Sequence, residues 1–356
     1  MINSQKREIF PELPEYVGLE AKGMQLCSYL IALEAWRRGL KIRFFSPSVK
    51  ISGLAIGDKI RHGRIFSIEN NEKKHYFCRS RGDLVSNNAR KVCKNKGEAK
   101  IKFREASVPH PEGFSFNIQK MSMEEILIKA KKIGYPVVLK PQSGSMGKGV
   151  LVNISSKEEL SKKIEELIVS ANNHSFIIEK HLTGNEYRCY VVGDKVIGII
   201  NRIPANVIGD GEKTIKELIE EKNNERKKIP FLTSKLIKVD KTVKENIKKL
   251  GYNLNTVPKQ NQVVYLRDVS NLAMGGDPID VTDSIPEEVK QVAVSALKAV
   301  DDLPHAGVDI IVDEKDHKKA YVLEINSTAE IGFHQYPLSG KPRNVAKAIV
   351  DYYFPE

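Results

Sequence analysis

Two acidic residues near the end of the sequence, Asp309 and Glu324, have the spacing of facing positions in a β-hairpin. An apolar, β-branched run at 307–312 and a second apolar run at 320–325 enclose a polar turn. If that turn closes symmetrically, Asp309 lies directly opposite Glu324, with Cβ atoms about 4.5–5.5 Å apart. The sequence therefore predicts two carboxylates that face each other across a pair of strands.

The same strand face is predicted to carry Asn326, which lies two residues after Glu324, together with Ile311 and Val322. Facing carboxylates repel each other unless a cation lies between them. A hard divalent cation with oxygen ligands fits this position, and Mg²⁺ is the usual one where phosphate is also bound. The alternative is a solvated strand end that carries two acids by chance, and the spacing alone leaves both interpretations open.

Composition restricts the class of protein. The chain has 356 residues, 41% of them hydrophobic, which is enough for two or three domains with a substantial core. No window approaches the roughly 18 unbroken apolar residues of a membrane span, and the first residues lack the apolar core of a signal peptide. We therefore expect a cytoplasmic protein with no membrane partner. The cysteines are predicted to be free thiols, since no CxxC pair is present: Cys27, Cys78, Cys93 and Cys189.

The formal net charge of +12 suits either nucleic acid or an anionic small molecule as a partner. Its distribution disfavours nucleic acid. Lysines are spread over predicted helix faces and mostly alternate with glutamates, and no basic tail or basic–aromatic alternation is present. A lysine-rich, solvated surface with one basic cleft accounts better for the charge.

Residues 1–90 read as a small α/β unit that carries no catalytic signature. Their pattern predicts a helix at 19–38, a strand at 41–45 and a hairpin formed by 64–68 and 75–78. This part of the chain is expected to serve substrate binding or packing.

Helices and strands alternate through the next stretch. A polar, basic helix is predicted at 88–105, and a second helix at 122–133 opens with the capping signal Ser122–Glu125. Two strands follow, at 136–140 and 149–154.

The loop between those two strands consists largely of small residues, which let backbone N–H groups approach phosphate oxygens. It is not a Walker A loop, because the GxxxxGK[ST] spacing is absent and a strand follows it. The alternative is a flexible hairpin tip. Lys140, at the end of the strand that leads into the loop, favours the phosphate interpretation. The loop residues singled out are Ser143, Gly144, Ser145, Met146, Gly147 and Gly149.

The remainder of the chain is also assigned from its pattern. It is predicted to contain helices at 157–170, 215–225, 241–249, 286–303 and 343–354, strands at 176–179, 186–192, 196–202 and 261–268, and a glycine-containing loop at 271–283.

This order of features resembles the ATP-grasp superfamily from about Asn88 to Glu356. The shared features are a strand–glycine loop–strand unit, a strand that runs into a Glu-Lys-x-Leu connection, and an acidic strand pair that ends in ExN. The stretches RIPANVIGDGEKTIKELIEEKN and VYLRDVSNLAMGGDPIDVTD are similar to cyanophycin synthetases and to the glutathione-synthetase half of the bacterial fused γ-glutamylcysteine ligase–glutathione synthetases. IIEKHLTGNEYRCYVVGD and the ExN motif also resemble D-alanine–D-alanine ligases.

The resemblance implies an α/β (α+β) ATP-grasp fold, in which antiparallel sheets enclose ATP. It divides the chain into an N-terminal α/β domain at 1–90, a central subdomain with the glycine-rich flap at 91–180, and a C-terminal subdomain with the metal site at 181–356.

The resemblance also implies roles for individual residues. Lys96, with Lys94 and Lys100 close to it in register, would be the first phosphate-binding lysine and Lys140 the second, and 143–149 would be the flap over the phosphates. The adenine connection would hold Glu179, Lys180 and Leu182, and the ribose acid would be Glu186. The Mg²⁺ ligands, for two ions with Mn²⁺ as an alternative, would be Asp309, Glu324 and Asn326.

Cationic groups near the transferred phosphoryl group are needed as well. D-alanine–D-alanine ligases carry an arginine two residues before the metal-binding aspartate, where this chain has Gly307. The missing charge is therefore expected from Arg202 or Arg267. The weaker substrate-binding candidates are Asn271, Gly275 and Gly276.

The function implied is an ATP-dependent carboxylate–amine ligase that joins amino acids or short peptides through an acylphosphate and releases ADP and phosphate. The alternatives are a ligase that modifies a protein or peptide tail and a non-catalytic ATP-binding regulatory protein. The sequence names neither substrate, and it leaves the oligomeric state open, with a homodimer among the options.

Overall fold

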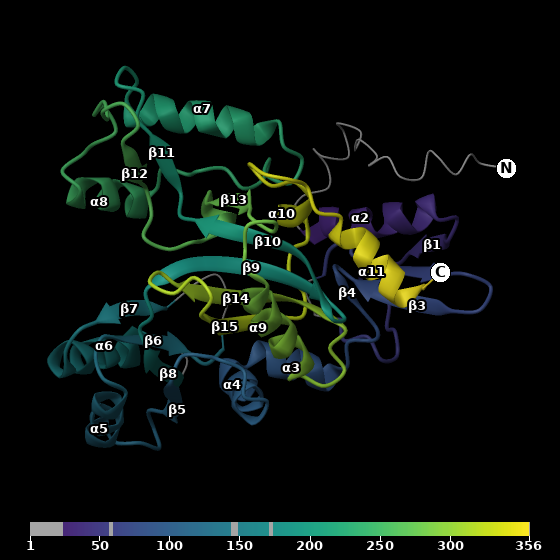
Figure 1. The fold of residues 1–356 in the computed structure, drawn as a ribbon, viewed down its shortest axis with the longest axis horizontal. Helices are drawn as coiled ribbons and strands as arrows, with labels where there is room; N and C mark the ends of the chain where they lie inside the picture. The colour runs from purple at the N-terminus through teal and green to yellow at the C-terminus, as the bar shows by residue number, and fades with distance from the viewer. Residues whose placement is uncertain (1–23, 57–59, 144–148, 171–173, 356) are drawn as a thin grey trace.

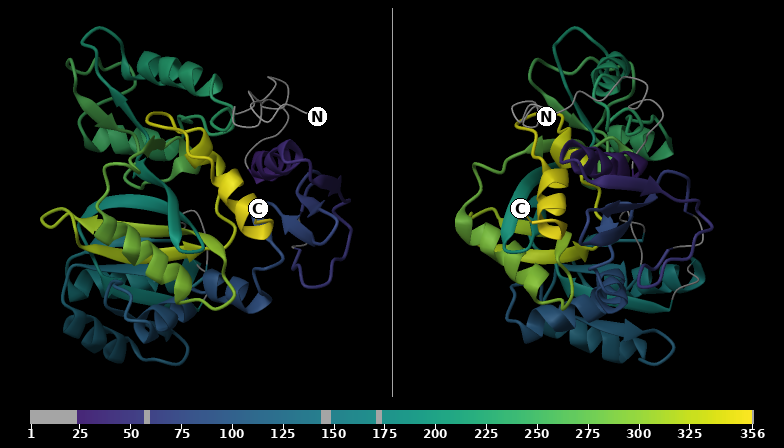
Figure 2. Two further views of the ribbon diagram at one scale, coloured as in Figure 1. Left: turned by 45° about the vertical axis from the view of Figure 1, so that its right-hand side comes forward. Right: turned by 90° about the vertical axis from the view of Figure 1, so that its right-hand side faces the viewer.

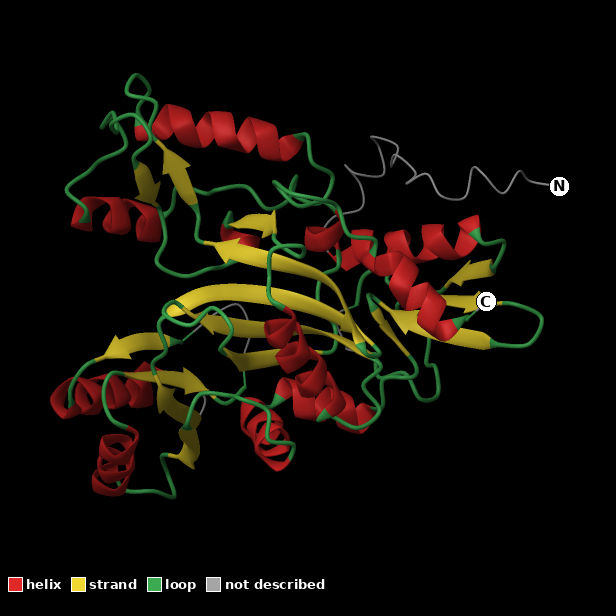
Figure 3. Ribbon diagram, in the orientation of Figure 1, coloured by secondary structure: helices red, strands yellow, loops and turns green. Residues whose placement is uncertain are grey.

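The described part of the computed structural model comprises residues 24–56, 60–143, 149–170 and 174–355, which form four β-sheets with helices packed on them. Figure 1 shows the arrangement from the N-terminal to the C-terminal end, and Figure 3 shows the same view with helices in red, strands in yellow and loops in green. No helix among these residues is both long enough and apolar enough to cross a bilayer.

The N-terminal part is a helix packed on a four-stranded antiparallel sheet with strand order β1-β2-β3-β4. The predicted strand and hairpin are confirmed, and the start of the predicted helix lies outside the described residues. The elements are α2 (Met24–Arg37), β1 (Lys41–Phe44), β2 (Ile65–Glu69), β3 (Lys74–Cys78) and β4 (Arg81–Gly82).

The two ends of the chain share one core. Helix α11 (Val345–Tyr353) packs along α2, as Figures 1 and 2 show, and the short helix α10 (Gly332–Gln335) joins them. The N-terminal sheet and the C-terminal helix therefore stabilise each other, although they are far apart in sequence.

The single helix predicted at 88–105 is wrong, because the chain breaks at Asn95 into α3 (Asn87–Lys94) and α4 (Lys96–Glu105). Asn95 has extended backbone angles, φ −108° and ψ 101°, and its side chain accepts hydrogen bonds from the first backbone N–H groups of α4. Asparagine is a strong N-cap residue, and its side chain competes with helix continuation. The break therefore starts a new helix at Lys96.

The central lobe is a second four-stranded antiparallel sheet with order β5-β8-β6-β7, covered by two helices. The predicted capping box is confirmed, with Ser122 and Glu125 satisfying each other's backbone N–H groups. The elements are β5 (Gly113–Asn117), α5 (Met123–Ile133), β6 (Val137–Pro141), β7 (Leu151–Ile154), α6 (Lys157–Ser170) and β8 (Ser175–Lys180).

The largest sheet has five antiparallel strands in the order β13-β10-β9-β14-β15. Helix α9 (Glu287–Lys298) covers one of its faces and ends earlier than the predicted 303. The prediction of a loop throughout 271–283 is wrong in part, because strand β13 lies within this stretch. The strands are β9 (Gly184–Val192), β10 (Lys195–Ile203), β13 (Asp277–Asp280), β14 (His305–Asp313) and β15 (Ala320–Asn326).

A small lobe lies on the other side of this sheet from the central lobe, as both views in Figure 2 show. Two helices pack on a two-stranded ribbon through an apolar core of their own. Its elements are β11 (Asn206–Ile208), α7 (Ile215–Lys227), α8 (Lys241–Lys249) and β12 (Val263–Tyr265), and the 3-10 helix η2 (Leu272–Met274) leads back to the sheet.

The predicted hairpin of β14 and β15 is confirmed, and Asp309 is paired with Glu324. The prediction that Val322 shares their face is wrong. The register shifts just beyond that pair, so that Val322 pairs with Ile310 and packs in the core under α9. An extra residue in one strand reverses the facing of the residues beyond it. Ile311 stays on the face of the acids.

Two histidines are buried where the large sheet meets the N-terminal part. Burial lowers the pKa of His305 to about 4 and that of His334 to about 3. The Nδ1 atom of His305 lies 3.2 Å from the Tyr190 hydroxyl. Both imidazoles are therefore neutral in the fold, because a buried charge is costly.

We expect the free energy of unfolding to fall as pH drops from about 6.5, the ordinary histidine pKa, toward 4. The unfolded chain binds protons in this range and the folded chain does not, so each histidine contributes a slope of up to about 1.4 kcal/mol per pH unit. In urea unfolding at pH 7, 6 and 5, His334→Leu should reduce the slope. His317→Gln, at an exposed position, is the control, and an unchanged slope in His334→Leu would contradict the assignment.

Candidate active site

The face of the large sheet that points away from α9 carries a row of charged side chains. Strand β14 lies between β9 and β15, and its Asp309 is paired in register with Arg188 on one side and Glu324 on the other. Because directly opposed side chains point the same way, these three groups lie side by side.

Asp309 is held by two arginines. Arg188 donates two hydrogen bonds, Nε to Oδ1 at 2.6 Å and Nη2 to Oδ2 at 2.7 Å, and Arg202 donates from Nη1 to Oδ2 at 3.0 Å. Burial alone would raise the pKa of Asp309, but the two guanidinium groups hold it below its ordinary value. The carboxylate is therefore ionised and fixed in orientation by a two-pronged arginine contact.

Arg188 is a residue that the sequence reasoning missed. Its signal was present, because it lies two residues after Glu186 on the same strand and so shares its face. The structure also accounts for Gly307. A Cβ atom there would lie 2.5 Å from Ala329 Cβ and 3.8 Å from Arg188 Cδ. Ala329 occupies the space beside Gly307. The positive charge next to Asp309 comes instead from Arg188 on the neighbouring strand β9.

Of the two arginines predicted, the structure brings only Arg202 to the acids. Its Nη1 lies 3.7 Å from Glu186 Oε2, and its Nη2 donates to the Ser270 carbonyl at 2.7 Å. Burial raises the pKa of Glu186, and the positive charge of Arg202 opposes that shift. Arg202 thus links Glu186, Asp309 and the loop before η2.

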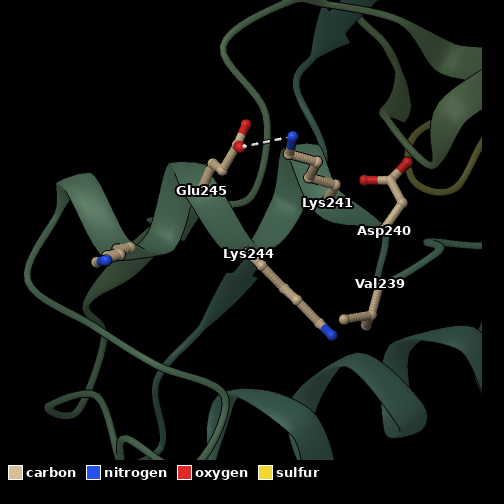
Figure 4. A pocket seen from close by; sticks show the side chains of 6 residues that line it. Val239, Asp240, Lys241, Lys244 and Glu245 are labelled. Atoms are coloured by element: carbon tan, nitrogen blue, oxygen red, sulfur yellow. Dashed lines mark ion pairs between the residues drawn. The ribbon is translucent and has the colours of Figure 1, made fainter.

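Arg267 instead belongs to the small lobe, where its Nη2 lies 2.6 Å from Asp240 Oδ2. Asp240 caps α8 and borders a hollow of about 380 Å³ that Figure 4 shows from close by. Lys244 and Val239 also line that hollow. Its other side chains include exposed charges, so we regard it as a solvated surface that is separate from the acidic row.

A second charged cluster lies in the central lobe, around the buried carboxylate of Glu179 on β8. Lys140 contacts one of its oxygens, and Lys100 lies 2.6 Å from the other. Burial alone would raise the pKa of Glu179, but the two lysines hold it below its ordinary value. Lys100, and not Lys96, therefore shares this carboxylate with Lys140.

Lys96 lies at the start of α4 and reaches the other cluster, with its Nζ atom 3.5 Å from Glu324 Oε2. The break at Asn95 accounts for this placement, since it starts a new helix at Lys96. Lys96 and Lys100, the neighbouring alternatives for the first phosphate-binding lysine, thus contact different carboxylates, and the phosphate role of either stays a prediction.

The remaining predicted nucleotide-binding residues lie at or near the ends of strands β6, β7 and β8. Lys180 donates to the carbonyl groups of Gly134 and Tyr135 at 3.0 and 3.1 Å, and Leu182 is partly buried. Of the predicted flap, Ser143 is exposed and Gly149 has a φ of 72°. The other flap residues lie outside the described part: Gly144, Ser145, Met146 and Gly147.

The three weaker candidates have structural explanations. Asn271 caps η2, because its side chain accepts a hydrogen bond from the Ala273 N–H. Gly275 has a φ of 95°, and a Cβ there would lie 2.7 Å from Ile237. A Cβ at Gly276 would lie 2.8 Å from the Ile203 carbonyl oxygen. Their substrate role stays a prediction.

The predicted metal ligands fit a divalent ion that arrives with an anion. Asp309, Glu324 and Asn326 supply oxygen ligands from adjacent strands, the type that Mg²⁺ prefers. No cluster of three or more His, Cys, Asp or Glu side chains suited to a metal is found among the described residues. Arg188 and Arg202 would repel an ion that came alone, so its binding would require an anion such as phosphate.

Arg188→Met should lower the free energy of unfolding by about 3–5 kcal/mol, because it leaves much of the buried charge of Asp309 uncompensated. Arg188→Met combined with Asp309→Leu should recover most of that loss, since both charges are then absent. Urea denaturation at pH 7 measures both values. Arg104→Met, at an exposed position, is the control, and a double variant no more stable than the single one would refute the pairing.

Comparisons with known proteins find similar proteins along most of the chain. Residues 95–208 match the family model described as carbamoyl-phosphate synthase L chain, ATP binding domain. The chain is 32% identical over 347 residues to the glutathione biosynthesis bifunctional protein GshAB of Clostridium perfringens. The matched region covers 95% of this chain and 42% of that protein. The chain is also 32% identical over 271 residues to cyanophycin synthetase of Geminocystis herdmanii. That matched region covers 74% of this chain and 30% of that protein.

A solved structure shares the fold. The bifunctional glutathione synthetase from Pasteurella multocida superimposes with a TM-score of 0.68 at 24% identity, covering 93% of this chain and 44% of that one. The chain thus spans less than half the length of each of these three proteins. The predicted fold and resemblance are confirmed: the chain has the fold of this solved structure and resembles proteins of the ATP-grasp superfamily.

Proposed function

We propose that the chain is an ATP-dependent carboxylate–amine ligase that forms an amide bond between amino acids or short peptides and releases ADP and phosphate. The observation that carries the proposal is the row Arg188–Asp309–Glu324, with Arg202 and Lys96 in contact with its carboxylates. Three cations around two acids suit a triphosphate better than a neutral ligand. The relatives support the reaction class, since their names are those of glutathione and cyanophycin synthesis.

The reaction needs an activated carboxylate, because a free carboxylate is a poor electrophile. A carboxylate oxygen of the donor attacks the γ-phosphorus of ATP, the bond to ADP breaks, and an acylphosphate forms. The amine then attacks the carbonyl carbon, loses a proton, and phosphate leaves. No nucleophilic side chain takes part, so the protein's contribution is positioning and charge stabilisation.

Each charged cluster has a distinct part in this proposal. Lys140 and Lys100 would turn from Glu179 to the phosphates of ATP, and Glu186 would accept hydrogen bonds from the ribose. Arg188 and Arg202 would stabilise the transferred phosphoryl group and the oxyanion that forms on amine attack. Mg²⁺ held by the Asp309–Glu324 pair and Asn326 would neutralise triphosphate charge.

The direct test is a phosphate-release screen of amino acids and dipeptides, in pairs, with ATP and Mg²⁺. The proposal expects release that depends on both a carboxylate and an amine partner. Release with a protein or peptide tail alone would favour the tail-modifying alternative. ATP binding with no release from any pair would favour a regulatory ATP-binding protein and overturn the ligase.

Glu324→Gln should lower ADP formation by about 100-fold or more, because the amide lacks the charge that a divalent ion needs from this position. Coupled-enzyme assay of ADP at saturating ATP measures it. Glu288→Gln, an exposed glutamate on α9, is the matched control and should retain full activity. ADP formation at the original rate in Glu324→Gln would remove Glu324 from the metal site.

Lys140→Met should weaken ATP binding by about ten- to a hundredfold, the usual effect of losing one hydrogen bond to a charged group. Titration calorimetry with ATP and Mg²⁺ measures the dissociation constant. Lys157→Met, an exposed lysine on α6, should bind ATP as the original chain does. Equal affinities in the two variants would exclude Lys140 from the phosphate site.

A further inference from the structure

An ion pair between Lys235 and Glu330 joins two segments that are far apart in sequence. Lys235 Nζ lies 2.9 Å from Glu330 Oε1, and the two side chains are only 11% and 16% exposed. Lys235 follows α7 of the small lobe, and Glu330 lies in the loop after β15. The main chain at Lys235 is fixed, because its carbonyl accepts a hydrogen bond from the buried Arg226 at 3.0 Å.

The loop that holds Glu330 lies against the charged row. Glu330 comes four residues after Asn326, and the Ser80 hydroxyl donates to the Ala329 carbonyl at 2.7 Å. Ala329 in turn fills the space beside Gly307, next to Arg188. Burial alone would lower the pKa of Arg188, and the charges of Asp309, Glu324 and, last among them, Glu330 hold it above its ordinary value. The ion pair thus borders the Arg188 end of the row.

The order of residues along the strands places this ion pair at the end of the row that is opposite Glu186. On the face of the row, β9 runs from Glu186 to Arg188, and β14 runs in the opposite direction from Gly307 to Asp309. The proposed nucleotide residues lie at the Glu186 end. A phosphoryl group near Arg188 would therefore have ATP on the Glu186 side and Glu330 on the other side.

The surroundings of Lys235 make it a carboxylate-binding group. Its Nζ lies 5.5 Å from the ring centroids of both Phe231 and Phe333, and these rings pack edge to face at 4.8 Å. Two aromatic rings favour an ammonium group but supply no hydrogen-bond acceptor for its N–H donors. A carboxylate is a suitable partner, because it accepts these hydrogen bonds and also balances the charge. Glu330 supplies that carboxylate from a side chain that is partly open to water.

We propose that Lys235 binds the free carboxylate of the acceptor substrate, and that Glu330 holds Lys235 in its place until the acceptor arrives. The inference rests on the proposed ligase function and names its acceptor class: an amino acid or peptide whose amine is close to a free carboxylate. Exchange of one carboxylate for another retains the charge balance at Lys235, while Glu330 turns toward solvent.

Opposite effects of two variants test this assignment. The acceptors are the twenty amino acids and their carboxamides, which lack the carboxylate charge. Lys235→Met should raise the KM for the amino acid about ten- to a hundredfold while leaving the KM for the carboxamide unchanged. Glu330→Gln should lower the KM for the amino acid, because a neutral amide competes less well for Lys235.

A pair with a purely structural role would behave differently. Both variants would then lose stability, and their KM values for amino acid and carboxamide would change together, which would overturn the assignment. Lys318→Met and Glu288→Gln form the control, since this exposed pair is also close, at 2.8 Å, and joins the turn after β14 to helix α9. Neither control variant should change either KM.

Trapping with hydroxylamine separates this inference from the ligase proposal. Hydroxylamine is a small acceptor without a carboxylate, so the original chain and both variants should form hydroxamate from the donor at equal rates. Hydroxamate formation together with unchanged KM values would overturn the role of Lys235 alone. Absence of hydroxamate from the original chain, with any amino acid or dipeptide as donor, would overturn the ligase and this inference with it.

Discussion

The buried carboxylate of Asp309 between two arginines is the interaction on which the site depends. A charge in this position is tolerated only when it is paired and hydrogen-bonded. Arg188 satisfies both carboxylate oxygens from the neighbouring strand, and Arg202 adds a third hydrogen bond from the strand beyond. The five-stranded sheet therefore has to hold three strands in a fixed register, because a slip of one residue would move these side chains to the opposite face.

The same requirement, that a buried charge is paired with an opposite charge, applies to both charged clusters of the protein. Each of the two clusters consists of carboxylates surrounded by cations: Asp309 and Glu324 on the large sheet, and Glu179 in the central lobe. In both, the carboxylates hold the cations in place, and the cations are the groups that a polyphosphate would contact. These ion pairs therefore support the proposal that a ligand of high negative charge with bound metal takes the place of the internal partners.

Much of the fold could be predicted because local rules decide it. The capping box at Ser122 and the helix at 241–249 follow from a few neighbouring residues, and the pairing of Asp309 with Glu324 follows from a turn of known length. Two other features were missed, one because a local capping signal was overlooked and one because it depends on pairing with a distant strand. Asn95 interrupts a continuous polar pattern, and the strand at 277–280 exists because its edge pairs with β10.

The sequence by itself determined the order of the elements, the resemblance to the ATP-grasp superfamily and the facing acids. Only the tertiary structure decided that Arg188 is the main partner of Asp309, that Lys100 joins Lys140 at Glu179, and that Arg267 turns away to Asp240. The physical reason is distance along the chain. Periodicity, caps and turns act over a few residues, whereas an ion pair between neighbouring strands or lobes depends on how the whole sheet brings them together.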